Sequence, residues 1–300
     1  WVTLGGQNLI GVGTHLKFYI SNVGNYNDVT PIRATVSLSN PFTTVSGSAV
    51  VTVLDSNGGY QDGDYVTFSN ASAVGGLTID GEFVVSLSVT TAANSYSITA
   101  SSNATSSATG GGTVSAAYQI NVGNPFAVPI EGWGASSWGS GAWNVGESST
   151  TAIRFFSQSN FGEDLIFGNN GGSIFYWDAT GSVTTRAVLL STLSGASDVP
   201  VVQNLILVSD ISRFVFCFGT NEIGSDTIDP TLLRWSDQED ATNWTPSATN
   251  QAGSLRLSRG TKIVAASQAR QEVLVWTDSS LYSLQYVGAP AVWAATLVGE

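Results

Sequence analysis

Hydrophobic and polar residues alternate along the chain in short paired runs, a pattern typical of β-hairpins. In the clearest pair, at residues 272–286, the alternation breaks at the polar turn Asp278-Ser-Ser and resumes at Leu281. Three similar pairs lie at residues 9–20, 164–178 and 214–237. The sequence therefore predicts four copies of one hairpin unit, the third of them interrupted by an inserted loop.

The spacing of these units favours a β-propeller within an all-β fold. Equivalent aromatic residues of the last three units, Phe167, Phe218 and Trp276, are 51 and 58 residues apart, and propeller blades repeat about every 40–50 residues before loop insertions. In such a blade a Trp fills the gap between sheets and an Asp fixes the adjoining turn. Residues of this kind, expected to mark the fold, are Trp235, Asp237, Trp244, Trp276 and Asp278.

Four hairpins are too few for most closed propellers, which have about four to eight blades of four strands. We therefore expect a propeller that is incomplete within this chain and is completed by sequence before Trp1 or after Glu300.

A stretch of different composition, residues 42–121, separates the first hairpin from the second. It is rich in Ser, Thr and Gly and carries five carboxylates but no Lys or Arg. About six short strands are expected there, including a hairpin around Asp80-Gly81, because Asp-Gly readily adopts the positive φ angles of a type I′ turn. We expect a small β-barrel or β-sandwich domain, inserted between propeller segments 1–41 and 122–300.

Residues 131–144 form a Gly- and Ser-rich loop with three tryptophans at five-residue spacing, Trp133, Trp138 and Trp143. Exposed aromatic rings of this kind usually mark contacts with other molecules. An interface between subunits is the favoured interpretation of this loop, and a platform on which sugars stack is the alternative.

Charge and composition exclude several functions. The net charge is −12, and no Lys or Arg occurs between Arg33 and Arg154, which argues against a surface that grips nucleic acid. The only cysteine, Cys217, lies in an apolar run and is expected to be a small buried residue. The longest apolar run, residues 199–208, is too short to span a membrane.

The sequence offers little for catalysis or metal binding. One histidine, His15, and one cysteine make a nucleophilic triad or a zinc site unsupported. Two acidic groups have the residue types of a glycosidase pair or a calcium site: Asp226 with Asp229, and Asp237 with Glu239 and Asp240. Both lie in expected turns, where Asp commonly binds backbone amides. We therefore predict a non-enzymatic protein with no catalytic residue, metal or cofactor.

A resemblance extends this interpretation. The chain resembles the tail-nozzle family of tailed bacteriophages, also called tail tubular protein B or the lower-tail stabilisation protein. The motifs that carry the resemblance, in chain order, are Gly13–Tyr19, Tyr26–Arg33, Gly63–Phe68, Gly75–Ile79, Arg234–Asp240, Asn243–Pro246, Ala252–Gly253 and Val275–Tyr282, together with the Gly/Trp-rich loop.

The resemblance implies a structural virion protein located in the phage tail. Such proteins form a ring of six identical subunits, contact tail adaptor and tail fibre or spike proteins, and conduct genomic DNA during ejection without binding it specifically. An acidic chain suits a conduit, because a basic lumen would hold the phosphates. The alternative is a glycan-binding or glycan-cleaving β-propeller, either a tail component or a secreted protein.

Overall fold

The computed structural model describes residues 2–4, 9–57, 59–88, 93–121, 131–132, 147–148, 154–210 and 212–300. These residues form an all-β protein, as the sequence predicts, with one short 3₁₀ turn, η1 (Leu190–Thr192). The chain divides into two compact units. The first is built mainly from Trp1–Val29 and Ala152–Glu300, and the second mainly from Thr30–Asn124.

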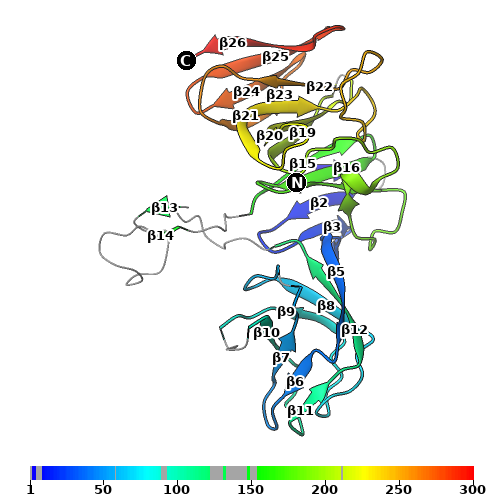
Figure 1. The fold of residues 1–300 in the computed structure, drawn as a ribbon. Helices are drawn as coiled ribbons and strands as arrows, with labels where there is room; N and C mark the ends of the chain where they lie inside the picture. The colour runs from blue at the N-terminus through cyan, green and yellow to red at the C-terminus, as the bar shows by residue number, and fades with distance from the viewer. Residues whose placement is uncertain are drawn as a thin grey trace. The chain divides into compact units, whose positions relative to one another are not determined.

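The first unit contains four antiparallel sheets of four strands, each paired in chain order (Figure 1). Sheet I has β1 (Val2–Leu4), β2 (Leu9–Gly13), β3 (Phe18–Asn22) and β4 (Asn25–Asp28). Sheet II has β15 (Phe156–Phe161), β16 (Asp164–Asn169), β17 (Ile174–Trp177) and β18 (Val188–Leu189). Sheet III has β19 (Gln203–Val208), β20 (Val215–Asn221), β21 (Ile228–Trp235) and β22 (Gly253–Arg256). Sheet IV has β23 (Ile263–Gln268), β24 (Glu272–Thr277), β25 (Leu281–Gly288) and β26 (Val292–Gly299).

The four predicted hairpins are all present, as the second and third strands of these sheets. Consecutive sheets contact one another through their first strands, β1 with β15, β15 with β19, and β19 with β23. That these sheets are successive propeller blades stays a prediction. The described residues form an open row of four sheets and not a closed ring.

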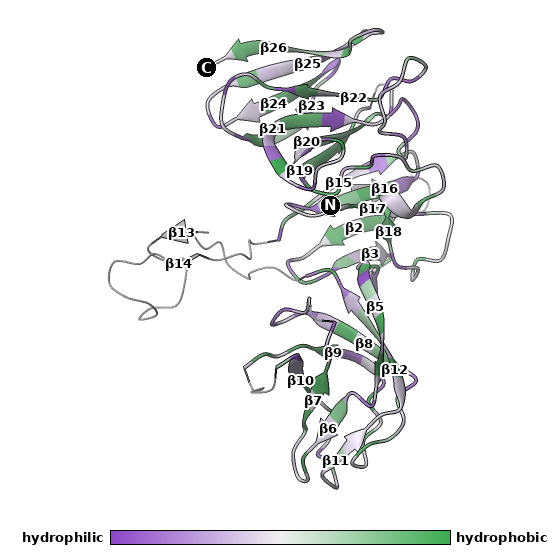
Figure 2. Ribbon diagram, in the orientation of Figure 1, coloured by the Kyte–Doolittle hydropathy of each residue, from purple (hydrophilic) through white to green (hydrophobic). Residues whose placement is uncertain are grey.

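Apolar side chains fill the spaces between neighbouring sheets of the row. Between sheets I and II, the rings of Phe18 and Phe167 stack with centroids 3.9 Å apart. Between sheets III and IV, Phe216 and Trp293 meet edge to face at 4.9 Å. Cys217 is fully buried between sheets II and III, as predicted, and burial raises the pKa of its thiol. Figure 2 shows hydrophobic residues gathered in the strands and hydrophilic ones in the connecting loops.

The second unit is a sandwich of two four-stranded sheets around one core. One sheet has the order β10 (Ser95–Thr99), β7 (Val50–Leu54), β6 (Phe42–Thr44) and β11 (Ala108–Gly110). The other has the order β5 (Ile32–Ser39), β12 (Thr113–Gln119), β8 (Tyr65–Ser69) and β9 (Gly81–Val84). A further two-stranded pair consists of β13 (Glu131–Gly132) and β14 (Glu147–Ser148).

The structure differs from the sequence interpretation of the second unit in two respects. The unit begins near Thr30 and not at residue 42, because β5 pairs with β12 along its whole length. The hairpin predicted around Asp80-Gly81 is wrong. Gly75 and Gly76 instead make a tight turn with positive φ between Val74 and Leu77, and Gly81 begins β9, which pairs with β8.

Candidate functional site

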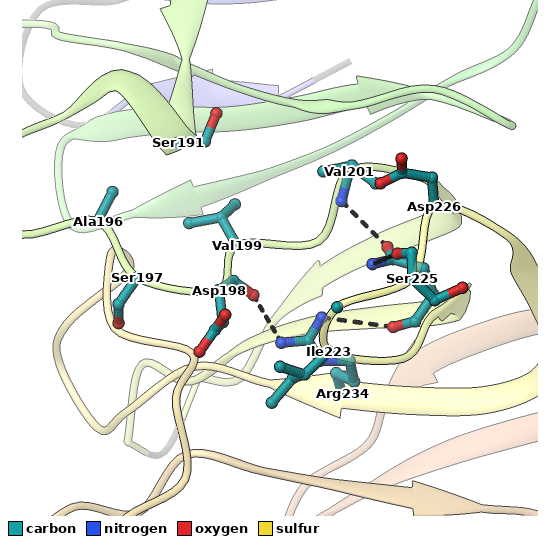
Figure 3. Close-up of a pocket in the computed structure, with 12 residues that line it drawn as sticks. Ser191, Ala196, Ser197, Asp198, Val199, Val201, Ile223, Ser225, Asp226 and Arg234 are labelled. Carbon is teal, nitrogen blue, oxygen red and sulfur yellow. Dashed lines mark hydrogen bonds between the residues drawn. The ribbon is translucent and has the colours of Figure 1, made fainter.

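One hollow in the first unit lies beside sheet III and has a volume of about 350 Å³ (Figure 3). Its lining comes from the loop before β19 and the loop between β20 and β21, with the side chain of Arg234 from β21. Arg234 also lines a second hollow of about 360 Å³. Both volumes fall within the range of small-ligand sites, about 300–1,000 Å³, so Arg234 is the first group to test for binding.

Arg234 is only 2 % exposed, and two of its amino groups donate to backbone carbonyl oxygens. Nη2 lies 2.6 Å from the carbonyl of Asp198, and Nη1 lies 3.3 Å from that of Asn221 (Figure 3). The guanidinium carbon is also 6.0 Å from the ring centroid of Trp244. Burial lowers the pKa of Arg234, and the neighbouring Cys217 and Asp198 oppose that shift. Through these two hydrogen bonds, Arg234 connects the two loops that border the hollow.

The residues around Arg234 are also engaged in building these loops. The side chain of Asn221 accepts from the amides of Val201 and Val202 and donates to the carbonyls of Glu222 and Ser225. The carboxylate of Asp198 accepts a hydrogen bond of 2.5 Å from Thr245 Oγ1. Because Asp198 and Asp226 both line the hollow, two carboxylates oppose the attraction that one buried guanidinium would offer an anion. The geometry favours a structural clamp over a ligand site.

Of the predicted acidic groups, Asp237 and Asp240 border a turn, whereas Asp229 lies within strand β21. Three aspartates each accept hydrogen bonds from both the amide and the hydroxyl of the Thr two residues later, at 2.6–2.9 Å. The three pairs are Asp178 with Thr180, Asp229 with Thr231, and Asp240 with Thr242. In this recurring Asp-x-Thr arrangement the carboxylate binds the local backbone in the manner expected of Asp.

Three aspartates of the first unit have a lowered pKa. Hydrogen bonds from Thr180 and Thr261 lower the pKa of Asp178 and of Asp278 respectively. For Asp229, burial acts to raise the pKa, but the hydrogen bonds from Thr231 and Arg256 outweigh it and the net shift is downward. A general acid near neutral pH needs the opposite shift. Within the described ranges, no group of three His, Cys, Asp or Glu residues is placed to hold a metal ion.

The tryptophans expected to mark the fold lie in three different environments. Trp235 is buried between sheets III and IV, and its Nε1 donates to the carbonyl of Gln251 at 2.8 Å. Trp244 is buried between sheets II and III, and its Nε1 donates to the carbonyl of Ala241 at 2.8 Å. Trp276 is half-buried and lies on the opposite face of β24 from the buried Val273 and Val275.

The two aspartates of that set each fasten a turn. Asp237 Oδ1 accepts from the amides of Gln238 and Gln251, both at 2.8 Å. Asp278 binds the amide and the hydroxyl of Thr261. The predicted interface residues Trp133, Trp138 and Trp143 lie outside the residues that the structure describes.

Sequence reasoning missed two features of the described chain. The first is the burial of Arg234, whose signal was its place on a strand between Leu233 and Trp235. The second is a buried polar chain in the sandwich, where Tyr118 donates to Asp55 Oδ2 and shares a hydrogen bond with Tyr96, both at 2.7 Å. No local sequence pattern announces the second feature, because its members lie on three separate strands or loops.

Comparison with known proteins identifies no family for this chain. No family of known proteins matches the sequence, and no curated protein does. Among solved structures, phage phi92 endosialidase is similar at 14 % identity over 95 % of this chain, with a TM-score of 0.27. This chain covers 43 % of that protein's chain. A likeness at this score carries no argument about function. The described part of the chain holds no helix with the length and hydropathy that a membrane span requires.

Proposed function

We propose that this protein is a structural component of a phage tail, a ring-forming subunit of the nozzle that conducts genomic DNA and anchors adjacent tail proteins. The proposal rests on the sequence resemblance described above. It is supported by the use that the described chain makes of its reactive groups: the candidates Asp237 and Asp240 bind backbone amides at a turn, and the buried Arg234 clamps two loops. These side chains stabilise the fold, and among the described residues they form no recognisable catalytic arrangement.

In this role the first unit supplies a rigid row of sheets and the second an independent sandwich with its own core. The net charge of −12 would repel DNA phosphates and prevent DNA from being retained during passage. Six copies, a tail adaptor and a fibre or spike protein are the partners that the resemblance implies.

Electron microscopy of the purified chain and of particles labelled with an antibody against it tests this proposal. We expect a ring with a central channel, and label confined to the tail. A protein that is absent from virions, or that cleaves glycans and loses this activity in the variant carrying both Asp237→Asn and Glu239→Gln, would contradict it. Glycan binding that disappears in Trp138→Ala would instead support the alternative lectin function.

A further inference from the structure

Each sheet of the row has two distinct faces, defined here by chain order. The leading face is turned toward the next sheet along the chain, and the trailing face toward the preceding one. Because side chains alternate between faces along a strand, the second strand of each sheet shows both. On β16, Leu165 and Phe167 are trailing, since they contact Gly11 and Phe18 of sheet I. Ile166 is leading, because it belongs to the apolar cluster shared with sheet III.

The same alternation holds in the next two sheets. On β20, Val215 and Cys217 are trailing and pack in the cluster with Ile166. Phe216 and Phe218 are leading and pack with the trailing residues of β24, Val273 and Val275. In each described interface of the row, an apolar cluster or stacked rings therefore join a leading face to a trailing face. Hydrogen bonds also cross between sheets II and III, such as those from the amides of Ile206 and Val208 to Ser157 and Ser159.

Two faces at the ends of the row continue this pattern, and no other described sheet of the first unit packs against them. On sheet IV the leading face carries Leu274 and Trp276, with Leu281 and Ala265 paired beside Trp276. On sheet I the trailing face carries Ile10 and Val12, with Tyr19 paired beside Val12. Both sets are only half-buried, although they occupy the strand positions that are buried in the interfaces inside the row.

We propose that a second copy of this chain covers these faces head to tail, with the leading face of sheet IV in one copy packed on the trailing face of sheet I in the other. This contact continues the interface that the row already uses three times. It is heterologous, so it closes into a ring when the rotation between copies permits. Two copies of four sheets each supply eight sheets, which is within the range of closed propellers.

Closure at two copies uses both end faces of each chain, so this pairing is separate from the contacts of the six-subunit ring in the proposed nozzle. It is argued from the sheet faces alone. A chain that pairs head to tail and is absent from virions would refute only the proposed function. A virion protein whose copies join through other surfaces would refute only this pairing.

Sedimentation and light scattering over a range of concentrations test the pairing. The chain has a mass of 31.2 kDa, and we expect a species of at least twice that mass. Trp276→Glu and Val12→Glu should each weaken association at least about 30-fold, the scale of an interface hot spot. Leu54→Glu is the matched control, since Leu54 is 56 % exposed on the sandwich and belongs to neither face. Circular dichroism checks that each variant is folded.

Mixing the two variants decides the geometry. Trp276→Glu keeps an intact trailing face and Val12→Glu an intact leading face, so a one-to-one mixture should recover one contact and form a dimer. Association of Val12→Glu with itself would show that like faces pair and would overturn the head-to-tail arrangement. A wild-type chain that stays monomeric at every concentration would overturn the proposal without any variant, and so would equal weakening by Leu54→Glu.

Discussion

The buried chain Asp55–Tyr118–Tyr96 in the sandwich predicts how strongly a single hydroxyl group stabilises the second unit. Asp55, Tyr96 and Tyr118 are at most 2 % exposed. Asp55 Oδ1 accepts from the amide of Asn57 at 2.8 Å, and Oδ2 accepts from Tyr118 at 2.7 Å. Because the hydroxyl of Tyr118 donates to Asp55, it must accept from the hydroxyl of Tyr96.

Tyr118→Phe keeps the ring and removes only this hydroxyl group. Asp55 Oδ2 then loses its donor inside the core, and Tyr96 loses its acceptor. A hydrogen bond to a carboxylate contributes about 1.5–3 kcal/mol, and a buried polar group left without a partner costs about 1–3 kcal/mol. We expect the free energy of unfolding of the sandwich to fall by about 2–3 kcal/mol. Tyr96→Phe removes one neutral hydrogen bond and should cost only about 1 kcal/mol.

Hydrogen exchange with mass spectrometry, followed as urea is increased, measures these losses in peptides from β7, β10 and β12. A peptide-resolved method is needed because all nine tryptophans lie outside residues 30–124. The double variant should cost less than the sum of the single ones, because they share one hydrogen bond. Equal losses for Tyr96→Phe and Tyr118→Phe, or strictly additive ones, would refute the assigned direction of the chain.

Three further outcomes follow from the structure. Burial raises the pKa of Tyr96, Tyr118 and Tyr176 above the usual 10.0. The stabilisation that these neutral phenols provide is therefore complete below about pH 10 and is lost as the pH rises toward their pKa values in the folded protein. Ultraviolet titration of tyrosinate should show these three ionising only as the protein unfolds, and ionisation of these three near pH 10 in the folded protein would contradict this. Gly253→Ala should destabilise the row by about 1–3 kcal/mol, because the added Cβ would lie 2.5 Å from Trp235 Cζ2. Gly299→Ala is the control and should change the melting temperature little, because no atom lies within 4 Å of its added Cβ. Equal melting temperatures for the two variants would count against the packing at Trp235. Cys217, fully buried with a raised pKa, should react with a thiol reagent only after unfolding, and stoichiometric labelling of the folded protein would show that sheets II and III separate readily.

The sequence predicts the four hairpins of the row because each is a local event, with alternating residues on both sides of a short turn. Trp235 and Trp244, expected from the sequence to mark the fold, are buried between neighbouring sheets. Features that depend on distant pairing are not predictable in this way. Tyr118 meets Asp55 across 63 residues, and β5 joins β12 and not the row, which moves the start of the inserted unit from residue 42 to near residue 30.

Two local signals point the wrong way for physical reasons. Asp80-Gly81 has the chemistry of a hairpin turn, but the preceding Gly75-Gly76 makes the turn, and Asp80 instead accepts a hydrogen bond from the amide of Ala71. Arg234 suggests an exposed strand face by residue type. It is buried because sheet III has a neighbouring sheet on each face, and the end of β21 that carries Arg234 lies between them.

The second unit begins and ends on neighbouring strands. β5 and β12 run antiparallel side by side from Ile32 paired with Gln119 to Ser39 paired with Thr113, and the amide of Ile120 donates to the carbonyl of Pro31 at 3.1 Å. A domain whose two ends nearly touch can be lost, gained or exchanged during evolution without stretching its host. Because β5 and β12 are adjacent, a short loop would suffice to join the chain on either side of the sandwich if the sandwich were removed.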